Sequence, residues 1–302
     1  MNGPATGKFR DPSLVDFGAD AEGHGRRLEL LGNVLVDRPL LQPDLPRRRT
    51  AHWTDAAAIF HAGHAGTGRT GSWTFTAPLP DPWQVAVPLS TATLSLEVRP
   101  APSGQIGVFL EQRDQWEWLA RETPAGSTML SLFAHSGAAT LAMATAGAHV
   151  VHVDASRQAI ALARRNAEAS GLAAAPIRWV CEDARAFVAR ELRRGARYDG
   201  VVLDPPSWGH GPKGQAFAID RDLVPLMADL AELTATKAAL AAHGPAGPVL
   251  LTCHSPRWRH RQLRDTLAEV FPSGRFESGP LTCTDAAGRT LELGDFARRP
   301  PS

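Results

Sequence analysis

The pattern of hydrophobic and polar positions changes near residue 104. Before that point, apolar and polar residues alternate over short stretches, most clearly at 85–89 and 94–98. Alternation with a period of two is typical of strands that bury one face. Proline and glycine are frequent in the same region, and helical periodicity is poor. We therefore predict that residues 1–104 form a small N-terminal β-rich domain or cap.

From residue 105 onward, short apolar runs alternate with segments of helical periodicity. One such segment begins at Ser156, a good N-cap residue, and ends before Gly171. Strands that alternate with helices favour an α/β fold with a parallel sheet and helices on both faces, here over residues 105–302. The predicted strands are 129–133, 149–153, 177–181, 198–203 and 248–253, and the predicted helices are 138–146, 156–170, 184–194, 223–243 and 257–271.

Composition narrows the class of protein. Hydrophobic residues make up 43% of the 302 residues, but no apolar run approaches the length of about 18 residues that indicates a membrane span. The N-terminus also has no apolar segment typical of a secretory signal, so we expect a cytoplasmic protein without a membrane partner. Lys and Arg total 32 against 31 Asp and Glu, so RNA binding would require a local basic patch. The three cysteines have no CxxC spacing, and we expect neither a disulfide framework nor a metal site.

The glycine-rich stretch 63–71 is the first place to look for a phosphate-binding loop. It lacks the Gly-Lys-Ser/Thr ending, and no apolar strand precedes it. The composition is instead typical of a flexible loop.

Acidic residues follow three of the first four strands predicted in the α/β region. They are Asp154, Asp183 and Asp204, and in a parallel sheet they share the carboxyl edge, where ligands bind. The loop after the first strand has only Gly137 in place of a GxGxxG sequence, which argues against a dinucleotide. An adenosyl ligand without phosphate groups, such as S-adenosylmethionine, tolerates that single glycine.

Each of these residues has a role with such a ligand and also a simpler explanation. Asp154 can accept hydrogen bonds from both ribose hydroxyls, Asp183 from the adenine amine, and the helix start after Gly137 can receive the methionine carboxylate. An Asp at a strand end is equally typical of a turn or of a helix N-cap. The sequence Asp204-Pro205-Pro206 is more specific, because two prolines stiffen the loop and leave carbonyl groups without competing N–H donors.

The segments 132–172, 176–188 and 198–214 together resemble the bacterial class I S-adenosylmethionine-dependent methyltransferases related to the large-subunit ribosomal RNA cytosine methyltransferases, especially their shorter relatives. The resemblance covers roughly residues 104–255. It implies a Rossmann-like sheet, S-adenosylmethionine as cofactor and ribosomal RNA as substrate. The positions that it implies for cofactor binding are Phe109, Gln112, Leu132, Phe133, Ala134, Ser136, Gly137, Asp154, Ala155, Asp183, Ala184 and Asp204.

The same resemblance places Asp204, Pro205 and Pro206 at the methyl-transfer centre, where they would orient the acceptor. Trp208 is a candidate for stacking on a flipped base. Lys213 is a candidate partner for a substrate phosphate, although a solvated loop lysine is the simpler explanation. For Phe109 and Gln112 the simpler explanation is a strand that leads into a helix.

One departure from the cytosine methyltransferases concerns the nucleophile. Those enzymes use a cysteine directly after the fifth strand to attack the base. Ser255 occupies that place in this chain, and Cys253 lies two residues earlier. We therefore expect Cys253 to be a buried structural thiol.

Two arginine runs are candidate RNA contacts. In the first, arginines 257, 261 and 264 would share one face of the predicted helix 257–271 and could follow an RNA backbone or simply be solvated. The second run is 47–49. Three functions remain open: an RNA methyltransferase, which the resemblance favours, a methyltransferase that acts on a small molecule or a protein, and a cofactor-binding protein without catalysis.

Overall fold

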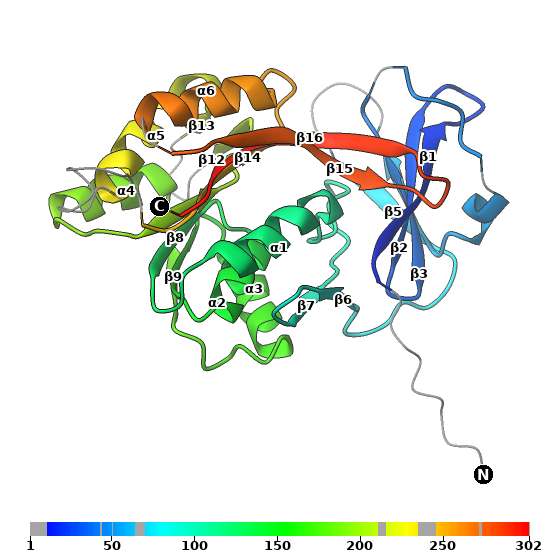
Figure 1. Ribbon diagram of the computed structural model, residues 1–302. Helices are drawn as coiled ribbons and strands as arrows, with labels where there is room; N and C mark the ends of the chain where they lie inside the picture. Colours follow the sequence, from blue (N-terminus) through cyan, green and yellow to red (C-terminus); the bar gives the residue numbers. More distant parts are fainter. Residues whose placement is uncertain are drawn as a thin grey trace, which may run out of the picture. The chain divides into compact units, whose positions relative to one another are not determined.

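The computed structural model describes residues 11–301 except 43, 50, 64–69, 211–215, 235–245 and 272–273. The chain forms two compact units, drawn in Figure 1. The first comprises Met1–Pro88, Ser95–Leu110 and Cys283–Leu291, and the second comprises Leu89–Leu94, Glu111–Thr282 and Glu292–Ser302. The division into functional domains at residue 104 stays a prediction, and each unit is described by itself.

The first unit is β-rich, as the alternation of apolar and polar residues predicts. Its five-stranded sheet has the order β1-β2-β3-β4-β5. Leu28 and Val36 are fully buried in this unit, and the Glu29 carboxylate pairs with the Arg38 guanidinium at 2.6 Å. The strands are β1 (Ser13–Ala19), β2 (Gly25–Leu31), β3 (Val34–Pro39), β4 (Ala58–Ala62) and β5 (Gly71–Phe75), with a short 3-10 helix at Ala51–Asp55.

The two clearest alternating stretches pair with each other. They form β6 (Gln84–Pro88) and β7 (Thr93–Glu97), which make a separate two-stranded sheet. Val85, Val87, Leu94 and Leu96 are fully buried, whereas the residues between them are half-buried. The period-two pattern therefore reports one buried face, as expected.

The second unit is built on a seven-stranded sheet with the order β10-β9-β8-β11-β14-β16-β15. The first five strands are parallel, and β16 runs antiparallel to β14. The order reverses between β8 and β11, which are hydrogen-bonded neighbours. The strands are β8 (Thr128–Leu132), β9 (His149–Asp154), β10 (Ile177–Cys181), β11 (Gly200–Leu203), β14 (Val249–Cys253), β15 (Glu277–Thr284) and β16 (Thr290–Arg299).

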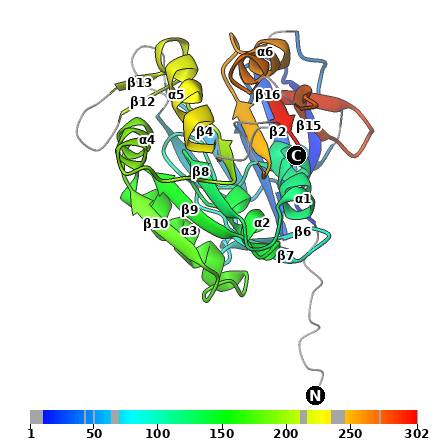
Figure 2. The same ribbon diagram turned by 60° about the vertical axis from the view of Figure 1, so that its left-hand side comes forward.

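Helices cover both faces of this sheet, as Figures 1 and 2 show. Helices α4, α5 and α6 pack over one face, where Leu130, Leu203 and Leu251 lie in the main apolar core. Burial of each such side chain stabilises the fold by about 1.5–3 kcal/mol. Helices α1, α2 and α3 lie over the other face. The helices are α1 (Arg113–Glu122), α2 (Ala138–Thr145), α3 (Arg157–Ala169), α4 (Ala184–Arg193), α5 (Ile219–Thr234) and α6 (His260–Val270).

The α/β expectation is confirmed, with corrections to several of the predicted elements. The hairpin β15–β16 was not predicted, because its strands contain many polar residues and depend on pairing with β14. Helix α6 begins at His260, so Arg257 lies before the helix and the predicted arginine face at 257, 261 and 264 is wrong. Helix α5 begins at Ile219, and the predicted helix end at 243 lies outside the described residues. Among the described residues, no helix is long and apolar enough to span a membrane.

Candidate functional site

The loops that follow β8, β9, β10 and β11 meet at the carboxyl edge of the second unit's sheet. Leu132 at the end of β8 pairs with Leu203 at the end of β11, and Asp154 at the end of β9 pairs with Cys181 at the end of β10. The strand order reverses between β8 and β11, where ligands bind in open α/β sheets. The topology therefore brings the predicted acidic residues to one edge.

The loop after β8 has an unusual backbone. Phe133 and His135 have positive φ angles of 53° and 43°, and Gly137 has a φ of 85°. Non-glycine residues adopt such conformations rarely, and they persist only where the surroundings hold them. A Cβ on Gly137 would lie 2.9 Å from the Cβ of Ala163 in α3. Glycine is therefore required at position 137 both by its φ angle and by the approach of α3.

Hydrogen bonds from neighbouring elements hold this loop. The His135 amide donates to Asp154 Oδ2 at 2.9 Å, and the buried Asn166 side chain donates to the Ser136 carbonyl at 2.9 Å. The first helical turn of α2 then begins directly after Gly137. The loop is thus fixed with backbone N–H groups at a helix start, which suits a carboxylate ligand.

Asp154 is half-buried at the end of β9 and accepts only backbone donors among the described residues. Its Oδ2 accepts the His135 amide, and its Oδ1 accepts the Ser156 amide at 2.8 Å. A carboxylate offers about four lone-pair sites, so acceptor capacity remains for two ligand hydroxyls. Ser156 in turn caps α3 by accepting the Ala159 amide at 3.2 Å. Turn formation and ligand binding are therefore compatible roles for Asp154.

Asp183 is the N-cap of α4. Its Oδ1 accepts the Ala186 amide at 3.1 Å and lies 3.6 Å from the Arg185 Nε atom. The N-cap role, which was the simpler explanation from the sequence, thus accounts for the observed contacts of Asp183. Its contact with adenine stays a prediction. Ala184 is buried at the start of α4 and Ala155 is half-buried in the turn after β9.

Asp204 is held by side chains rather than by the backbone. Gln112, the N-cap residue of α1, donates to Asp204 Oδ2 at 3.1 Å and to the buried Thr252 hydroxyl at 3.2 Å. His254 Nδ1 lies 3.3 Å from Asp204 Oδ1. The Asp204 side chain is 37% exposed. Its carboxylate is therefore oriented on two sides and still accessible.

His254 also contacts a second carboxylate. Its Nε2 lies 3.2 Å from Glu111 Oε1. Burial opposes the charged imidazole, but the charges of Asp204 and Glu111 outweigh it and raise the pKa of His254 to about 11. For Asp204 burial acts to raise the pKa, yet the His254 charge and a hydrogen bond with Thr252 lower it. Both groups are therefore charged at neutral pH.

Two other histidines at the same edge are neutral. Burial lowers the pKa of His135, although the charges of Asp154 and Asp204 oppose this. Burial, reinforced by His135, lowers the pKa of His152 to about 3, and the His152 Nδ1 atom is 2.9 Å from the Thr140 hydroxyl. His135 and His152 therefore add no positive charge that would repel a cationic ligand.

The stretch after Asp204 leads into a short two-stranded antiparallel sheet. Pro205 is buried and Pro206 is exposed. Strand β12 (Trp208–His210) pairs with β13 (Ala216–Ala218), and the Trp208 side chain is 59% exposed. Stacking of the exposed Trp208 indole on a base stays a prediction, and Lys213 lies outside the described residues.

Cys253 is fully buried in β14. Burial raises the pKa of its thiol to about 12, and its sulfur accepts the Ser255 amide at 3.3 Å. Because the thiolate is the nucleophilic form, this thiol is inert at neutral pH. The structure thus agrees with a structural role for Cys253.

The polar groups at this edge of the sheet fit S-adenosylmethionine. Asp154 offers acceptors for ribose hydroxyls, the loop 133–137 leads into a helix start, and the carboxylates carry the negative charge that suits a sulfonium ion. The sequence matches the family described as S-adenosylmethionine-dependent methyltransferase over residues 73–255. The chain belongs to this family. The match confirms the predicted fold class, the enzyme class and the cofactor.

Three relatives of this methyltransferase illustrate the similarity. The SAM-dependent methyltransferase structure from Agrobacterium tumefaciens is 31% identical, with a TM-score of 0.82 and coverage of 100% of this chain and 95% of that one. Ribosomal RNA large subunit methyltransferase I of Aeromonas hydrophila is 34% identical over 34% of this chain and 26% of its own length. Ribosomal RNA large subunit methyltransferase K of Neisseria meningitidis is 32% identical over 44% of this chain and 38% of its own length. The matches span less than half of these two curated relatives.

The other residues predicted to bind the cofactor of this methyltransferase differ in how deeply they are buried and in what they contact. Leu132 is buried in the core and Ala134 is half-buried in the loop. The Phe133 ring packs on Phe217 with ring centroids 5.0 Å apart, so it faces the core. Phe109 belongs to the first unit.

Some polar residues at this edge were not among the predicted site residues, namely Glu111, His135, Asn166, Thr252 and His254.

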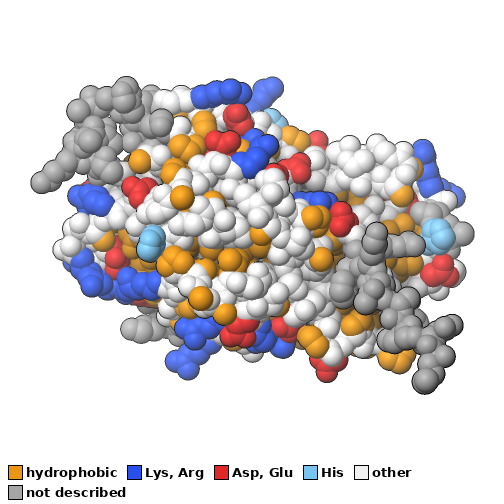
Figure 3. All heavy atoms as spheres, turned by 60° about the horizontal axis from the view of Figure 1, so that its bottom comes forward, with side chains coloured by type: hydrophobic (Ala, Val, Ile, Leu, Met, Phe, Trp, Pro, Cys, Tyr) orange, Lys and Arg blue, Asp and Glu red, His pale blue; other side chains and the backbone are white. Residues whose placement is uncertain are grey.

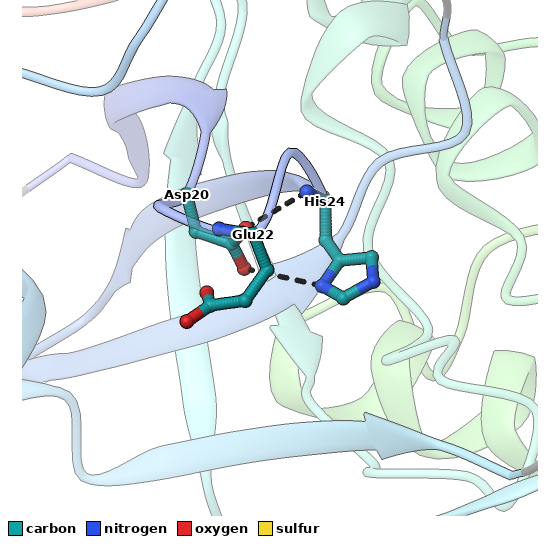
Figure 4. Close-up of side chains that lie close together, drawn as sticks. All are labelled: Asp20, Glu22 and His24. Atoms are coloured by element: carbon teal, nitrogen blue, oxygen red, sulfur yellow. Dashed lines mark hydrogen bonds and ion pairs between the residues drawn. The ribbon is translucent and has the colours of Figure 1, made fainter.

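A possible metal-ligand group lies elsewhere. Asp20, Glu22 and His24 in the β1–β2 turn bring three ligand atoms within 4.8 Å of one another (Figure 4). Asp20 Oδ1 already accepts the amides of Glu22 and His24 at 3.1 and 2.8 Å. These contacts explain the cluster as the stabilisation of an exposed turn.

Proposed function

We propose that this enzyme transfers a methyl group from S-adenosylmethionine to a base of ribosomal RNA. One observation carries the proposal. The matched segments of this chain are 34% and 32% identical in sequence to two ribosomal RNA large subunit methyltransferases. The bound cofactor would supply an activated methyl group on a positively charged sulfur. We assign cofactor binding to the loop 133–137, Asp154 and Asp183, and acceptor positioning to Asp204, Pro205 and Pro206.

The residues at the end of β11 suggest the kind of acceptor. The Asp204 carboxylate is ionised and partly accessible, so it can accept a hydrogen bond from an N–H group of a base. Carbon 5 of cytosine would instead need a cysteine nucleophile, and the Cys253 thiol is buried and protonated. We therefore favour a base nitrogen as the methyl acceptor. Because such a nitrogen reacts through its own lone pair, catalysis rests mainly on positioning and on exclusion of water.

The two arginine runs differ in charge compensation. Around α6, Arg257 pairs with Asp220 at 3.5 Å, Arg259 with Glu292 at 2.9 Å and Arg264 with Asp265 at 2.8 Å. The arginines at 47–49 are exposed, and within the described parts of the chain none of their guanidinium groups forms an ion pair with a carboxylate. The Arg48 guanidinium lies 4.9 Å from the Trp53 ring centroid, and its charge opposes the rise that burial causes in the pKa of Asp37. We therefore propose that the run 47–49 contacts RNA phosphates.

The wider surface supports a local RNA contact over a general one. Blue basic and red acidic side chains are interspersed on the face in Figure 3, and the net charge is +1. A contact that involves few phosphates predicts a shallow dependence of RNA affinity on salt concentration. This dependence distinguishes a local patch from a broad basic face.

Methylation of ribosomal RNA with tritiated cofactor tests the proposal. We expect incorporation into RNA, and we expect one methylated nucleoside to disappear from total RNA of cells that lack the protein. Replacement of arginines 47, 48 and 49 by Glu should weaken RNA binding by about tenfold or more, with a shallower salt dependence. The matched replacement of arginines 257, 261 and 264 should have a smaller effect. Incorporation into protein or small molecules but not into RNA would overturn the proposal.

A further inference from the structure

We propose that His254 is a positioning residue for methyl transfer, because its imidazolium bridges Asp204 and Glu111 and fixes the carboxylate that receives the acceptor's N–H group. This inference rests on the proposed function for the identity of the acceptor. It concerns a residue that lies directly after β14, whereas Asp204 lies directly after β11. These two strands are parallel neighbours in the sheet.

The geometry itself specifies the charge of the bridge. His254 Nδ1 faces Asp204 Oδ1 at 3.3 Å, and His254 Nε2 faces Glu111 Oε1 at 3.2 Å. An ionised carboxylate only accepts hydrogen bonds, and a neutral imidazole donates from only one nitrogen. A neutral imidazole would turn the lone pair of one ring nitrogen toward a carboxylate, so the two contacts, a hydrogen bond with Glu111 and an ion pair with Asp204, favour the charged form.

The surroundings of the bridge preserve that charge. Glu111 is 5% exposed and would be expensive to bury without a cation. Gln112 and Thr252, which complete the contacts around Asp204, are uncharged. From the loop after β8, the facing group is His135, which burial keeps neutral. From β14 itself, Cys253 is a protonated thiol. From β16, the Asp295 carboxylate is already paired with Arg259 and His260. Among the described residues, His254 is thus a cation in contact with both Asp204 and Glu111.

This arrangement excludes one role for His254 and supports another. An imidazolium has no lone pair to receive a proton, so His254 does not act as a general base. Its contact with Oδ1 and the Gln112 contact with Oδ2 instead hold the carboxylate of Asp204 on both sides.

Replacement of His254 by Gln tests this role in the full-length protein. We expect kcat to fall by about ten- to a hundredfold, because the ion pair with Asp204 and the fixed orientation of its carboxylate are lost. KM for S-adenosylmethionine should change less than kcat. The acidic limb of the kcat profile should move to higher pH, because burial raises the pKa of Asp204 once the cation is gone. A reduced kcat with an unshifted acidic limb would overturn the role.

His260→Gln is a matched control. His260 Nδ1 lies 2.9 Å from Asp295 Oδ1, and the exposures of the two side chains, 33% and 5%, equal those of the pair His254–Glu111. The control removes a similar ion pair outside the site. It should leave kcat and its pH profile unchanged. If kcat and its pH profile changed equally in the two variants, the role of His254 would be limited to the stability of the fold.

Histidine NMR gives a readout that does not need methyl transfer. In the wild-type protein the His254 ring should stay protonated at pH 8, and in Asp204→Asn its pKa should fall. Titration of wild-type His254 near its usual pKa of about 6.5 would overturn the bridge. If RNA is not methylated but the ring is protonated as expected, the proposed function fails while the bridge stands.

Discussion

Two carboxylates at the same edge of the sheet are held in different ways. Asp154 accepts backbone amides from residues close in sequence, His135 and Ser156. Asp204 is held by side chains distant in sequence, Gln112 and His254. The first arrangement builds a turn that can bind a ligand, whereas the second sets the charge and the direction of one carboxylate. The difference suggests that Asp154 serves cofactor affinity and Asp204 serves the methyl-transfer step.

Asp204→Asn should have the largest effect. The neutral amide loses its ionic contact with His254 and presents a weaker acceptor to the base, so kcat should fall by about a hundredfold or more. Single-turnover kinetics with excess enzyme would measure the step directly. Asp265→Asn removes an exposed carboxylate of α6 and serves as control. Retention of most of the wild-type rate in Asp204→Asn would refute the role of this residue.

Asp154→Ala should affect binding instead. The loss of two hydrogen bonds from ribose hydroxyls to a carboxylate should raise the Kd for S-adenosylmethionine by about ten- to a hundredfold. At saturating cofactor, kcat should recover most of its wild-type value. Equilibrium dialysis and steady-state kinetics measure the two quantities. A low kcat of Asp154→Ala at saturating cofactor would contradict the proposal that Asp154 serves binding and Asp204 serves methyl transfer.

Gly137→Ala tests the loop that Asp154 supports. The new Cβ meets Ala163 at 2.9 Å and the φ is 85°, so crowding and the left-handed backbone together should lower the free energy of unfolding by about 2–4 kcal/mol. Gly171 also has a positive φ, but a Cβ added there would have no atom within 4 Å. Gly171→Ala should therefore cost only about 1–2 kcal/mol. Thermal or urea unfolding of both variants would show whether crowding contributes.

Cys253→Ala should have the smallest effect on activity. Burial keeps this thiol protonated at neutral pH, so we predict that it takes no chemical part. We expect kcat within about twofold of the wild-type value, with a modest loss of stability from the small cavity. If a folded Cys253→Ala protein had no activity, a covalent mechanism with carbon 5 of cytosine as the methyl acceptor would be supported instead.

The sequence predicts the surroundings of Asp154 better than those of Asp204. The contacts of Asp154 are local, so the strand end and the N-cap residue Ser156 foretell them. The Asp204 partners come from the start of α1 and from the end of β14, and only the strand order places β14 beside β11. His254 directly follows the fifth predicted strand, so the rule that singled out Asp204 could have found it.

Parts of the fold also depended on long-range contacts. Strands β8, β9 and β10 are apolar or bounded by clear helix signals, and their predicted ranges match the structure closely. Strand β16 mixes charged and apolar residues, and its antiparallel pairing with β14 supplies the missing information. Helix α6 begins later than predicted, because Arg259 is its N-cap residue and the Gln262 side chain accepts the Arg259 amide at 2.8 Å.

Calorimetric titration of S-adenosylmethionine into the wild-type protein, Asp154→Ala and Asp204→Asn tests the central claim most directly. We predict heat of binding for the wild-type protein, a Kd within about threefold for Asp204→Asn, and binding weakened by at least about tenfold for Asp154→Ala. Equal weakening in both variants, or no binding by the wild-type protein, would contradict the separate roles of the two aspartates.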